Sequence, residues 1–126
     1  MALRLLVVDD EIRVLRSLTR TLRFKGAEVL AAGGSREALE LLVEHEVDAV
    51  ITDHHMPRGP SGIWLLENVA HRYPSVRRIL FSGRVVSHAE ELVKLGMVHC
   101  FLRKPITASD VLAASQKLDA TQNQET

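Results

Sequence analysis

Short apolar segments alternate with segments of helical periodicity along the 126 residues of the chain. Five of the apolar segments are rich in Val, Ile and Leu, and several are apolar at consecutive positions rather than at every second position. Consecutive apolar positions are typical of strands that are buried on both faces of a sheet. The predicted strands are 3–8, 27–31, 49–52, 78–82 and 99–102. Glu28 lies inside the second segment and indicates a less buried strand at an edge of the sheet.

Apolar residues three and four positions apart predict five helices between and after these strands. The stripes are Ile12, Leu15, Leu18 and Leu22; Ala38, Leu41 and Leu42; Ile63, Leu66 and Ala70; Ala89, Leu92 and Val93; and Val111, Ala114 and Leu118. Gly26 and Gly96 stand where the first and fourth helices are expected to end, because glycine readily adopts the left-handed conformation that often follows a helix. Capping boxes are predicted from Ser87 with Glu90 and from Thr107 with Asp110.

The fivefold alternation of strand and helix predicts an α/β fold in which helices cover both faces of a parallel sheet. The crossovers between parallel strands are expected to be right-handed. A chain of this length suits one domain, which we predict for residues 1–118. Residues 119–126 are polar and lack periodicity, so we predict a polar tail or the start of a linker there.

Composition argues against several other classes of protein. The 16 basic and 16 acidic residues cancel, which disfavours broad electrostatic binding of nucleic acid or of an anionic membrane. Cys100 is the one cysteine, so an internal disulfide, a zinc ribbon and a thioredoxin-like site are excluded. No apolar stretch approaches the roughly 20 residues of a membrane span, and the N-terminus does not fit a signal peptide. We therefore expect a protein of the reducing cytoplasm.

Polar residues stand at the ends of four of the five predicted strands. Asp9 and Asp10 follow the first strand, and Asp53 follows the third. Ser82 ends the fourth strand, and Lys104 follows the fifth. Each residue alone has a simpler explanation, such as a helix cap or a solvated charge. Because ligands of open α/β sheets bind outside the carboxyl ends of the strands, the joint placement of these residues predicts a site.

Three carboxylates, a hydroxyl and an ammonium group at one edge favour chemistry on phosphate. Clustered carboxylates repel one another, so they either raise a pKa or bind a cation. An all-oxygen site of this kind favours Mg²⁺ or a similar hard ion such as Mn²⁺. A carboxylate can attack phosphorus and form an aspartyl phosphate. Lysine then supplies a positive charge to the phosphate, and serine supplies a directional hydrogen bond.

Four segments together resemble the receiver domain of bacterial response regulators, in the CheY-like superfamily. They are VVDDE at the acidic pair, TDHHMP at Asp53, ILFSG at Ser82 and FLRKP at Lys104. Each segment alone is a weak signal, but in this order and at these strand ends they are highly specific, and the match covers about residues 3–118. The resemblance implies a flavodoxin-like, doubly wound sheet of five parallel strands in the order 2-1-3-4-5 with five helices. A member of this family is itself the standard example of that strand order.

The resemblance also implies a role for each acidic residue of the site. Asp53 matches the residue that accepts the phosphoryl group. Asp10 matches a direct ligand of Mg²⁺ or Mn²⁺, and Asp9 matches its companion, which acts through water. The backbone carbonyl of His55 matches a further protein ligand of the metal, beside Asp10 and Asp53.

Further roles follow from the same resemblance for residues near the last two strands. Ser82 matches the switch hydroxyl that hydrogen-bonds the phosphoryl group, and Lys104 matches the lysine that contacts it. Pro105 matches a proline that follows a cis peptide bond. Phe101 matches an aromatic switch residue that turns inward on activation. It lacks the hydroxyl of the more familiar tyrosine, so its switch would depend on ring packing.

Other positions also depart from the usual family pattern. The segment from Asp53 to Gly62 is one residue longer than is common, through residues 58–60. His55 and Arg84 stand at positions that tune the rates of phosphorylation and dephosphorylation in the family. Both side chains are large and able to carry positive charge, so we expect an unusual lifetime of the phosphoryl group.

The implied function is that of a phosphoacceptor domain of two-component signalling, not that of an enzyme. A histidine kinase or a histidine phosphotransfer protein would phosphorylate Asp53 with Mg²⁺ and so change the surface of the fourth helix, fifth strand and fifth helix. A C-terminal output domain, a downstream protein and a homodimer stay open as partners. Direct binding of nucleic acid and of membrane is not expected.

Three alternative functions fit the sequence less well. A pseudo-receiver is an interaction module of the same fold without phosphorylation, but such domains usually lose an acidic residue, the acceptor or the lysine. A metal-dependent phosphoesterase would explain the string Asp53-His54-His55, yet that class needs further aspartate and histidine motifs over a much longer chain. A haloacid-dehalogenase-like phosphatase would need an Asp-x-Asp motif after the first strand, which this sequence lacks.

Other residues are predicted to be structural or solvated. Trp64 is expected to pack on the third helix, and Cys100 is expected to be a buried, small apolar residue of the last strand. Arg72, Arg77 and Arg78 are expected to form a solvated cluster on the surface.

Overall fold

Strands and helices alternate five times along the chain. The computed structural model describes the backbone of residues 2–125 and the side chains of residues 2–116. The strands are β1 (Arg4–Val8), β2 (Glu28–Ala32), β3 (Ala49–Asp53), β4 (Arg77–Ser82) and β5 (Cys100–Arg103). The helices are α1 (Ile12–Phe24), α2 (Ser35–Glu44), α3 (Gly62–Arg72), α4 (Ala89–Lys94) and α5 (Ala108–Glu125). Each strand boundary lies within one residue of its predicted position, so the predicted alternation is confirmed.

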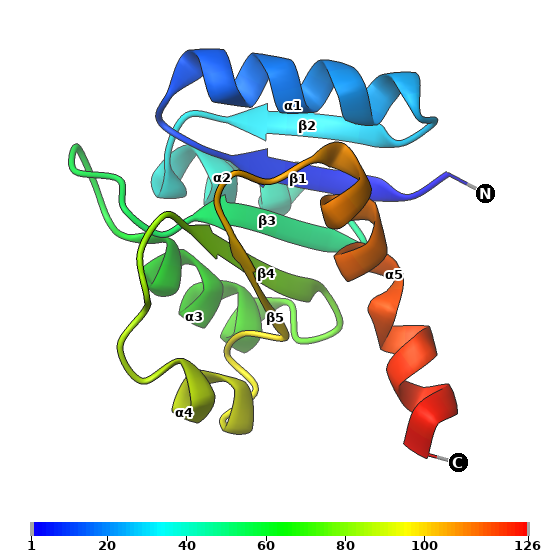
Figure 1. Ribbon diagram of the computed structural model, residues 1–126. Coiled ribbons are helices and arrows are strands. Elements are labelled where there is room, and N and C mark those ends of the chain that lie inside the picture. Colours follow the sequence, from blue (N-terminus) through cyan, green and yellow to red (C-terminus); the bar gives the residue numbers. More distant parts are fainter. Residues whose placement is uncertain (1, 126) are drawn as a thin grey trace.

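The five strands form one parallel sheet in the order β2-β1-β3-β4-β5 (Figure 1). The strand order that the resemblance implied is therefore confirmed. The central strands β3 and β4 are buried along their whole length, and β1 is buried after Arg4. β2 and β5 are partly exposed, because each has only one neighbouring strand. The exposed Glu28 of β2 thus predicted an edge strand correctly.

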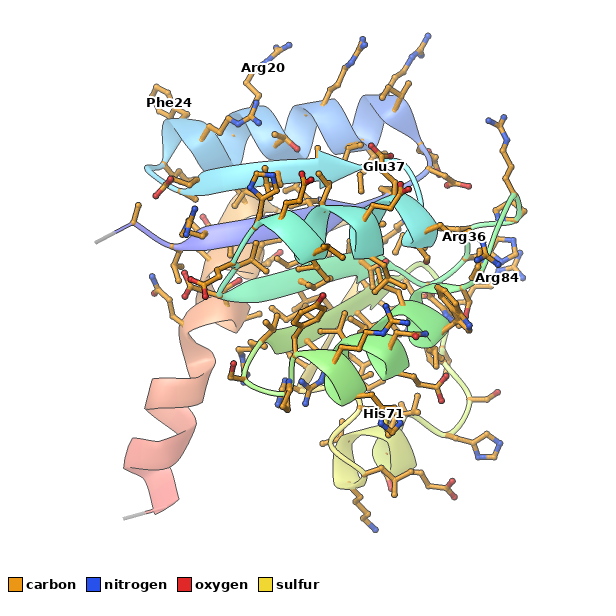
Figure 2. All side chains as sticks on the ribbon, turned by 180° about the vertical axis from the view of Figure 1, so that it is seen from behind. Arg20, Phe24, Arg36, Glu37, His71 and Arg84 are labelled. Carbon is orange, nitrogen blue, oxygen red and sulfur yellow. The ribbon has the colours of Figure 1, made fainter. Side chains whose placement is uncertain are left out.

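Helices cover both faces of the sheet, as a comparison of Figures 1 and 2 shows. On one face, α1 and α5 enclose a core that includes Leu5, Val7, Leu22, Ile51, Phe81 and Val111. On the other face, α2 and α3 enclose a core that includes Leu6, Val8, Val50, Leu65, Leu66 and Leu80. Successive residues of a strand point to opposite faces, so the central strands need apolar residues at consecutive positions. The doubly wound α/β fold is confirmed.

Helices α1 and α4 end just before the glycines that were predicted to terminate them. Gly26 and Gly96 have φ angles of 100° and 76°, in the left-handed region that glycine adopts without strain. After α1, the N–H group of Ala27 donates to the carbonyl of Leu22, which closes the end of the helix. The same pattern follows α4, so the two predicted helix ends are confirmed.

The two predicted capping boxes have different outcomes. At the start of α5, the N–H of Asp110 donates to Oγ1 of Thr107 at 3.1 Å, and the N–H of Thr107 donates to Oδ2 of Asp110 at 3.0 Å. At the start of α4, the prediction was wrong. His88 is the N-cap there, with a left-handed backbone at φ 61° and no side-chain capping bond. Ser87 therefore lies one residue too early to cap the first turn.

The backbone of α5 continues to Glu125, through most of the segment predicted to be a polar tail or the start of a linker. Several residues of this segment, including alanine, glutamine and glutamate, have good helix propensity, which the lack of apolar periodicity does not reveal. No helix among residues 2–125 has the length and apolar character that crossing a membrane requires.

Arg77 and Arg78 are each only 5% exposed, so the prediction of a solvated cluster was wrong for both. The Nε–H of Arg77 donates to the carbonyl of Ala114 in α5 at 2.6 Å. The guanidinium of Arg78 donates to backbone carbonyls of Pro74, Val76, Gly96 and Met97. These carbonyls lie in the connections before β4 and after α4, where no regular ladder satisfies them. Arg72 is exposed, as predicted.

Candidate functional site

The carboxyl ends of the strands bring the predicted site residues to one edge of the sheet (Figure 1). Asp9 and Asp10 follow β1, and Asp53 is the last residue of β3. One carboxylate oxygen of each of these aspartates lies within 4.8 Å of the other two. The ammonium group of Lys104, after β5, lies 3.3 Å from Oδ2 of Asp53. Residues from three distant parts of the sequence thus form one charged cluster.

A cleft of about 430 Å³ opens beside Asp53, between the β3–α3 and β4–α4 connections. His55, Ser82 and Lys104 line it together with Asp53, and so does Arg84. Ser82 is buried, and its Oγ accepts a hydrogen bond from the N–H of Arg84 at 3.1 Å. Figure 2 shows the side chain of Arg84 at this end of the sheet. Ser82, Lys104 and Asp53 therefore share one cleft.

The donor set of the cluster suits a hard divalent cation. Asp9 is 1% exposed, and its Oδ1 accepts a hydrogen bond from the N–H of Glu11 at 2.9 Å. Its Oδ2 is buried without any hydrogen-bond partner among the described residues. A buried carboxylate oxygen without a partner is costly, and two further carboxylates beside it add repulsion. A cation with oxygen ligands, such as Mg²⁺, would remove both costs.

The electrostatics of the site show the same conflict as shifts of pKa. Burial raises the pKa of Asp9 to about 6, and the nearby carboxylates of Asp53 and Glu11 add to this rise. The hydrogen bond from the N–H of Glu11 and the charge of Lys104 act in the opposite direction. Burial also raises the pKa of Asp53, against the charge of Lys104, and the carboxylate of Asp10 contributes to that rise.

Asp9 gives rise to a prediction about pH and stability in the absence of metal. Between pH of about 4 and 6 the folded chain keeps a proton on Asp9 that the unfolded chain has released, so this residue contributes less stability as pH rises. His99 acts in the opposite sense, because burial and the charges of Arg78 and Arg77 lower its pKa to about 4. An Asp9→Asn variant removes the first effect together with the repulsion between Asp9 and Asp53. We expect its free energy of unfolding to rise relative to wild type by about 2 kcal/mol across this range.

Urea unfolding of both proteins with a chelator present, at pH 4 and at pH 6.5, measures this difference. His99 titrates in both proteins and cancels from the comparison. If the difference in free energy of unfolding between the two proteins is the same at both pH values, the raised pKa of Asp9 is contradicted.

Two residues that the sequence did not single out support the site. The ring of Phe81 lies beneath Lys104, whose ammonium is 5.4 Å from the ring centre, a distance that suits a cation–π interaction. Gly62 donates its N–H to the carbonyl of His54 at 2.9 Å, and a Cβ at this position would collide with the carbonyl oxygen of Asp53. Both contacts join residues that are not neighbours in the sequence, so sequence spacing gave no signal for them.

The remaining predicted residues have these positions. The peptide bond between Lys104 and Pro105 is cis, as the resemblance implied. His55 is exposed, and Phe101 is half-buried against the core that α2 and α3 cover. Cys100 is half-buried rather than buried, because β5 is an edge strand. Trp64 is half-buried on α3, where it packs against the core as predicted.

The chain is similar to sensory and regulatory proteins of bacteria. A family model described as the response regulator receiver domain matches residues 5–116. The sensory/regulatory protein RpfC of Xanthomonas campestris pv. campestris is 31% identical over 115 residues, which cover 88% of this chain and 16% of RpfC. The chain spans only 16% to 25% of the length of RpfC and of three other similar curated sequences.

Two solved structures share the fold. A response regulator receiver domain protein (CheY-like) from Methanospirillum hungatei JF-1 has a TM-score of 0.85 and 24% identity, with all of both chains covered. A response regulator protein from Burkholderia pseudomallei, with a phosphorylated aspartic acid, calcium ion and citrate, has a TM-score of 0.82 and 25% identity. That match covers 98% of this chain and 73% of the other.

Proposed function

The chain belongs to the family of response regulator receiver domains, and from this premise we propose that Asp53 accepts a phosphoryl group in two-component signalling. One observation carries the proposal. Three carboxylates within 4.8 Å of one another and an ammonium group 3.3 Å from Asp53 meet at the carboxyl edge of the sheet. The similar Burkholderia pseudomallei structure has a phosphorylated aspartic acid, which supports the same chemistry here.

In this proposal the carboxylate of Asp53 attacks the phosphorus of a phosphohistidine in line. The new P–O bond forms as the P–N bond to a histidine kinase or phosphotransfer protein breaks. Asp10, Asp53 and the backbone carbonyl of His55 would hold Mg²⁺ or Mn²⁺, with Asp9 acting through water, and the ion would offset charge on the phosphoryl oxygens. Lys104 then exchanges its contact with the carboxylate for one with the transferred group.

Ser82 and Phe101 would carry the change away from the site. The hydrogen bond from Arg84 uses a lone pair of the Ser82 hydroxyl, so its hydrogen stays available for a phosphoryl oxygen. Movement of Ser82 toward that oxygen would free space for the half-buried ring of Phe101. α4 has no buried side chain, so it can shift at small cost in packing. The surface of α4, β5 and α5 would then change its population of conformations.

Acetyl phosphate with Mg²⁺ tests this function without a kinase. We expect the mass of the intact protein to increase by one phosphoryl group, on a bond that hydroxylamine cleaves. Beryllofluoride with Mg²⁺ should shift backbone amide signals of α4 and β5. If neither reagent changes the protein, the acceptor role is wrong and the pseudo-receiver alternative is favoured.

Ser82→Ala should separate phosphotransfer from its consequence. We expect the variant to accept a phosphoryl group at a rate within about tenfold of wild type, because Asp53 and Lys104 are unchanged. The shifts of the amide signals of α4 and β5 on phosphorylation should be largely lost, because the variant has no hydroxyl that could move to hydrogen-bond a phosphoryl oxygen. Phosphorylated Ser82→Ala with the full wild-type shifts would refute the switch role of Ser82.

We also propose that the partner is a histidine kinase or histidine phosphotransfer protein and that the chain acts in the reducing cytoplasm. The relatives in which a similar segment occurs include sensory and transcriptional regulatory proteins several times longer than this chain. An output domain or a downstream protein would read the changed surface. Co-incubation with purified candidate kinases and labelled ATP tests the donor directly.

A further inference from the structure

The β3–α3 loop, residues 54–61, borders the acidic site and is held by a side chain from α2. This loop contains His55, whose carbonyl is a proposed metal ligand. Its backbone is restrained locally by a turn in which the N–H of Gly59 donates to the carbonyl of Met56 at 3.1 Å. Among the described residues, Ser35 is the one residue outside the loop and α3 whose side chain hydrogen-bonds to it.

Ser35 is the first residue of α2 and is only 2% exposed. Its Oγ lies 3.0 Å from the carbonyl oxygen of Pro60 and 3.2 Å from that of Ser61. Ser61 is the N-cap of α3, and its own Oγ accepts a hydrogen bond from the N–H of Trp64 at 3.1 Å. The hydroxyl of Ser35 therefore fixes the point at which the loop ends and α3 begins.

The neighbouring residue of α2 strengthens the same link. The guanidinium of Arg36 lies 5.4 Å from the ring centre of Trp64, in a cation–π arrangement between α2 and α3. Figure 2 shows Arg36 at the end of the sheet where the acidic site lies. The start of α2 and the start of α3 are thus joined by a buried hydrogen bond and a more exposed ring contact.

The end of the loop also packs closely against the backbone of Asp53. Gly62 follows Ser61 directly, and it lies so close to the carbonyl of Asp53 that even a methyl group would not fit. The N–H of Gly62 donates to the carbonyl of His54 at 2.9 Å, and the N–H of His54 donates to Phe81 at 3.0 Å. A shift of the loop end therefore moves the backbone of Asp53 and of the residues that follow it.

We propose that Ser35 is a positioning residue of the acidic site, whose hydroxyl holds the β3–α3 loop so that the carboxylate of Asp53 and the carbonyl of His55 converge on one divalent cation. This inference rests on the proposed function, because it assumes that the site binds such a cation. The hydrogen bond from Ser35 restrains the end of the loop that carries the carbonyl of His55.

Ser35→Ala removes the hydroxyl and little volume. Its matched control is Ser115→Ala on α5, because Ser115 is also buried and its Oγ donates to the carbonyl of Val111 at 2.7 Å. Mg²⁺ affinity is measured by calorimetry and by fluorescence of Trp64, the one tryptophan of the chain. The free energy of unfolding is measured in chelator. Both measurements are made without any phosphodonor.

We expect Ser35→Ala to bind Mg²⁺ about tenfold more weakly than wild type, the order of effect of hydrogen bonds that orient metal ligands. Ser115→Ala should bind Mg²⁺ as wild type does, although both variants lose one buried hydrogen bond and similar stability. Ser35→Cys fills the volume but donates only weakly, so it should bind Mg²⁺ nearly as weakly as Ser35→Ala. It also provides the test if Ser35→Ala does not fold.

The outcomes distinguish this inference from the function on which it rests. If wild type binds Mg²⁺ and Ser35→Ala binds it equally well, Ser35 stabilises the fold only and its positioning role is wrong. If Ser35→Cys restores wild-type affinity, packing and not the hydrogen bond is responsible, which also overturns it. If wild type itself binds no Mg²⁺, the metal-assisted function fails and the positioning role fails with it.

Discussion

Replacing Asp53 by asparagine is expected to abolish phosphorylation by acetyl phosphate and by any cognate kinase. The amide nitrogen and oxygen of asparagine cannot supply the anionic oxygen that attacks phosphorus, whereas the volume of the side chain hardly changes. The loss should be complete within detection, at least about 10³-fold in rate, because the nucleophile itself is removed. Intact-protein mass spectrometry after incubation with acetyl phosphate and Mg²⁺ measures it.

Asp48→Asn provides a matched control beside the same strand. Asp48 directly precedes β3, at its amino end, and its Oδ2 accepts a hydrogen bond from the N–H of Arg4 at 2.8 Å. An asparagine can still accept that bond, and the residue lies at the opposite end of the strand from the cleft. This variant should be phosphorylated as wild type is. Persistent labelling of Asp53→Asn, including a transfer of the label to Asp10, would show that the acceptor has been misassigned.

The loss of one carboxylate should also change the metal site and the stability of the apo protein. Burial raises the pKa of Asp53, so its charge is unfavourable in the cluster without a cation. Asp53→Asn should therefore be no less stable than wild type in chelator, although it lacks activity. If the variant is folded but unreactive, the loss of reaction comes from the missing nucleophile and not from a damaged fold. A circular dichroism spectrum shows whether the variant is folded.

The sequence predicted the strands and the acidic edge because both depend on local pattern. Consecutive apolar residues such as those of β1 and β3 can be buried on both faces only in a covered parallel sheet. Once the sheet is parallel, Asp9, Asp53 and Lys104 must lie at the same edge, since they follow strands that all point the same way. The cluster within 4.8 Å is a consequence of that topology.

The contacts that the sequence did not predict depend on the fold of distant segments. Whether Ser35 hydrogen-bonds to Pro60 is decided by the packing of α2 against α3, and no local pattern contains that information. The same holds for Gly62, whose tight contact with Asp53 exists only because the loop closes there. The Ser87 capping box failed for a smaller reason, since a turn at His88 delays the start of α4 by one residue.

The two arginines of β4 are the clearest case in which their charge led to a wrong prediction. Two adjacent arginines were predicted to lie on the solvated surface, because burying an isolated cation is costly. The fold offers Arg78 four backbone carbonyls in place of water, and it offers Arg77 the carbonyl of Ala114. Burial lowers the pKa of both side chains, and none of the carboxylates among residues 2–116 forms an ion pair with them.

Arg78→Met is accordingly expected to destabilise the fold strongly. Methionine keeps much of the apolar stem and the volume, but it removes every donor that the guanidinium directs at Pro74, Val76, Gly96 and Met97. Carbonyls that lose their partner in a buried position cost about 1–3 kcal/mol each, and relaxation toward water recovers part of this. We expect a loss of about 3 kcal/mol in the free energy of unfolding, measured by urea denaturation at pH 7.

Arg72→Met is the matched control, because Arg72 is an exposed arginine in the last turn of α3. Its loss should change the free energy of unfolding by no more than about 0.5 kcal/mol. Arg78 lies at the amino end of β4 and the proposed phosphoryl site lies at its carboxyl end, so folded Arg78→Met should still be phosphorylated by acetyl phosphate. Equal stability of the two variants would mean that water satisfies those carbonyls as well as the guanidinium does. The connections before β4 and after α4 would then have to be held together by their apolar contacts alone.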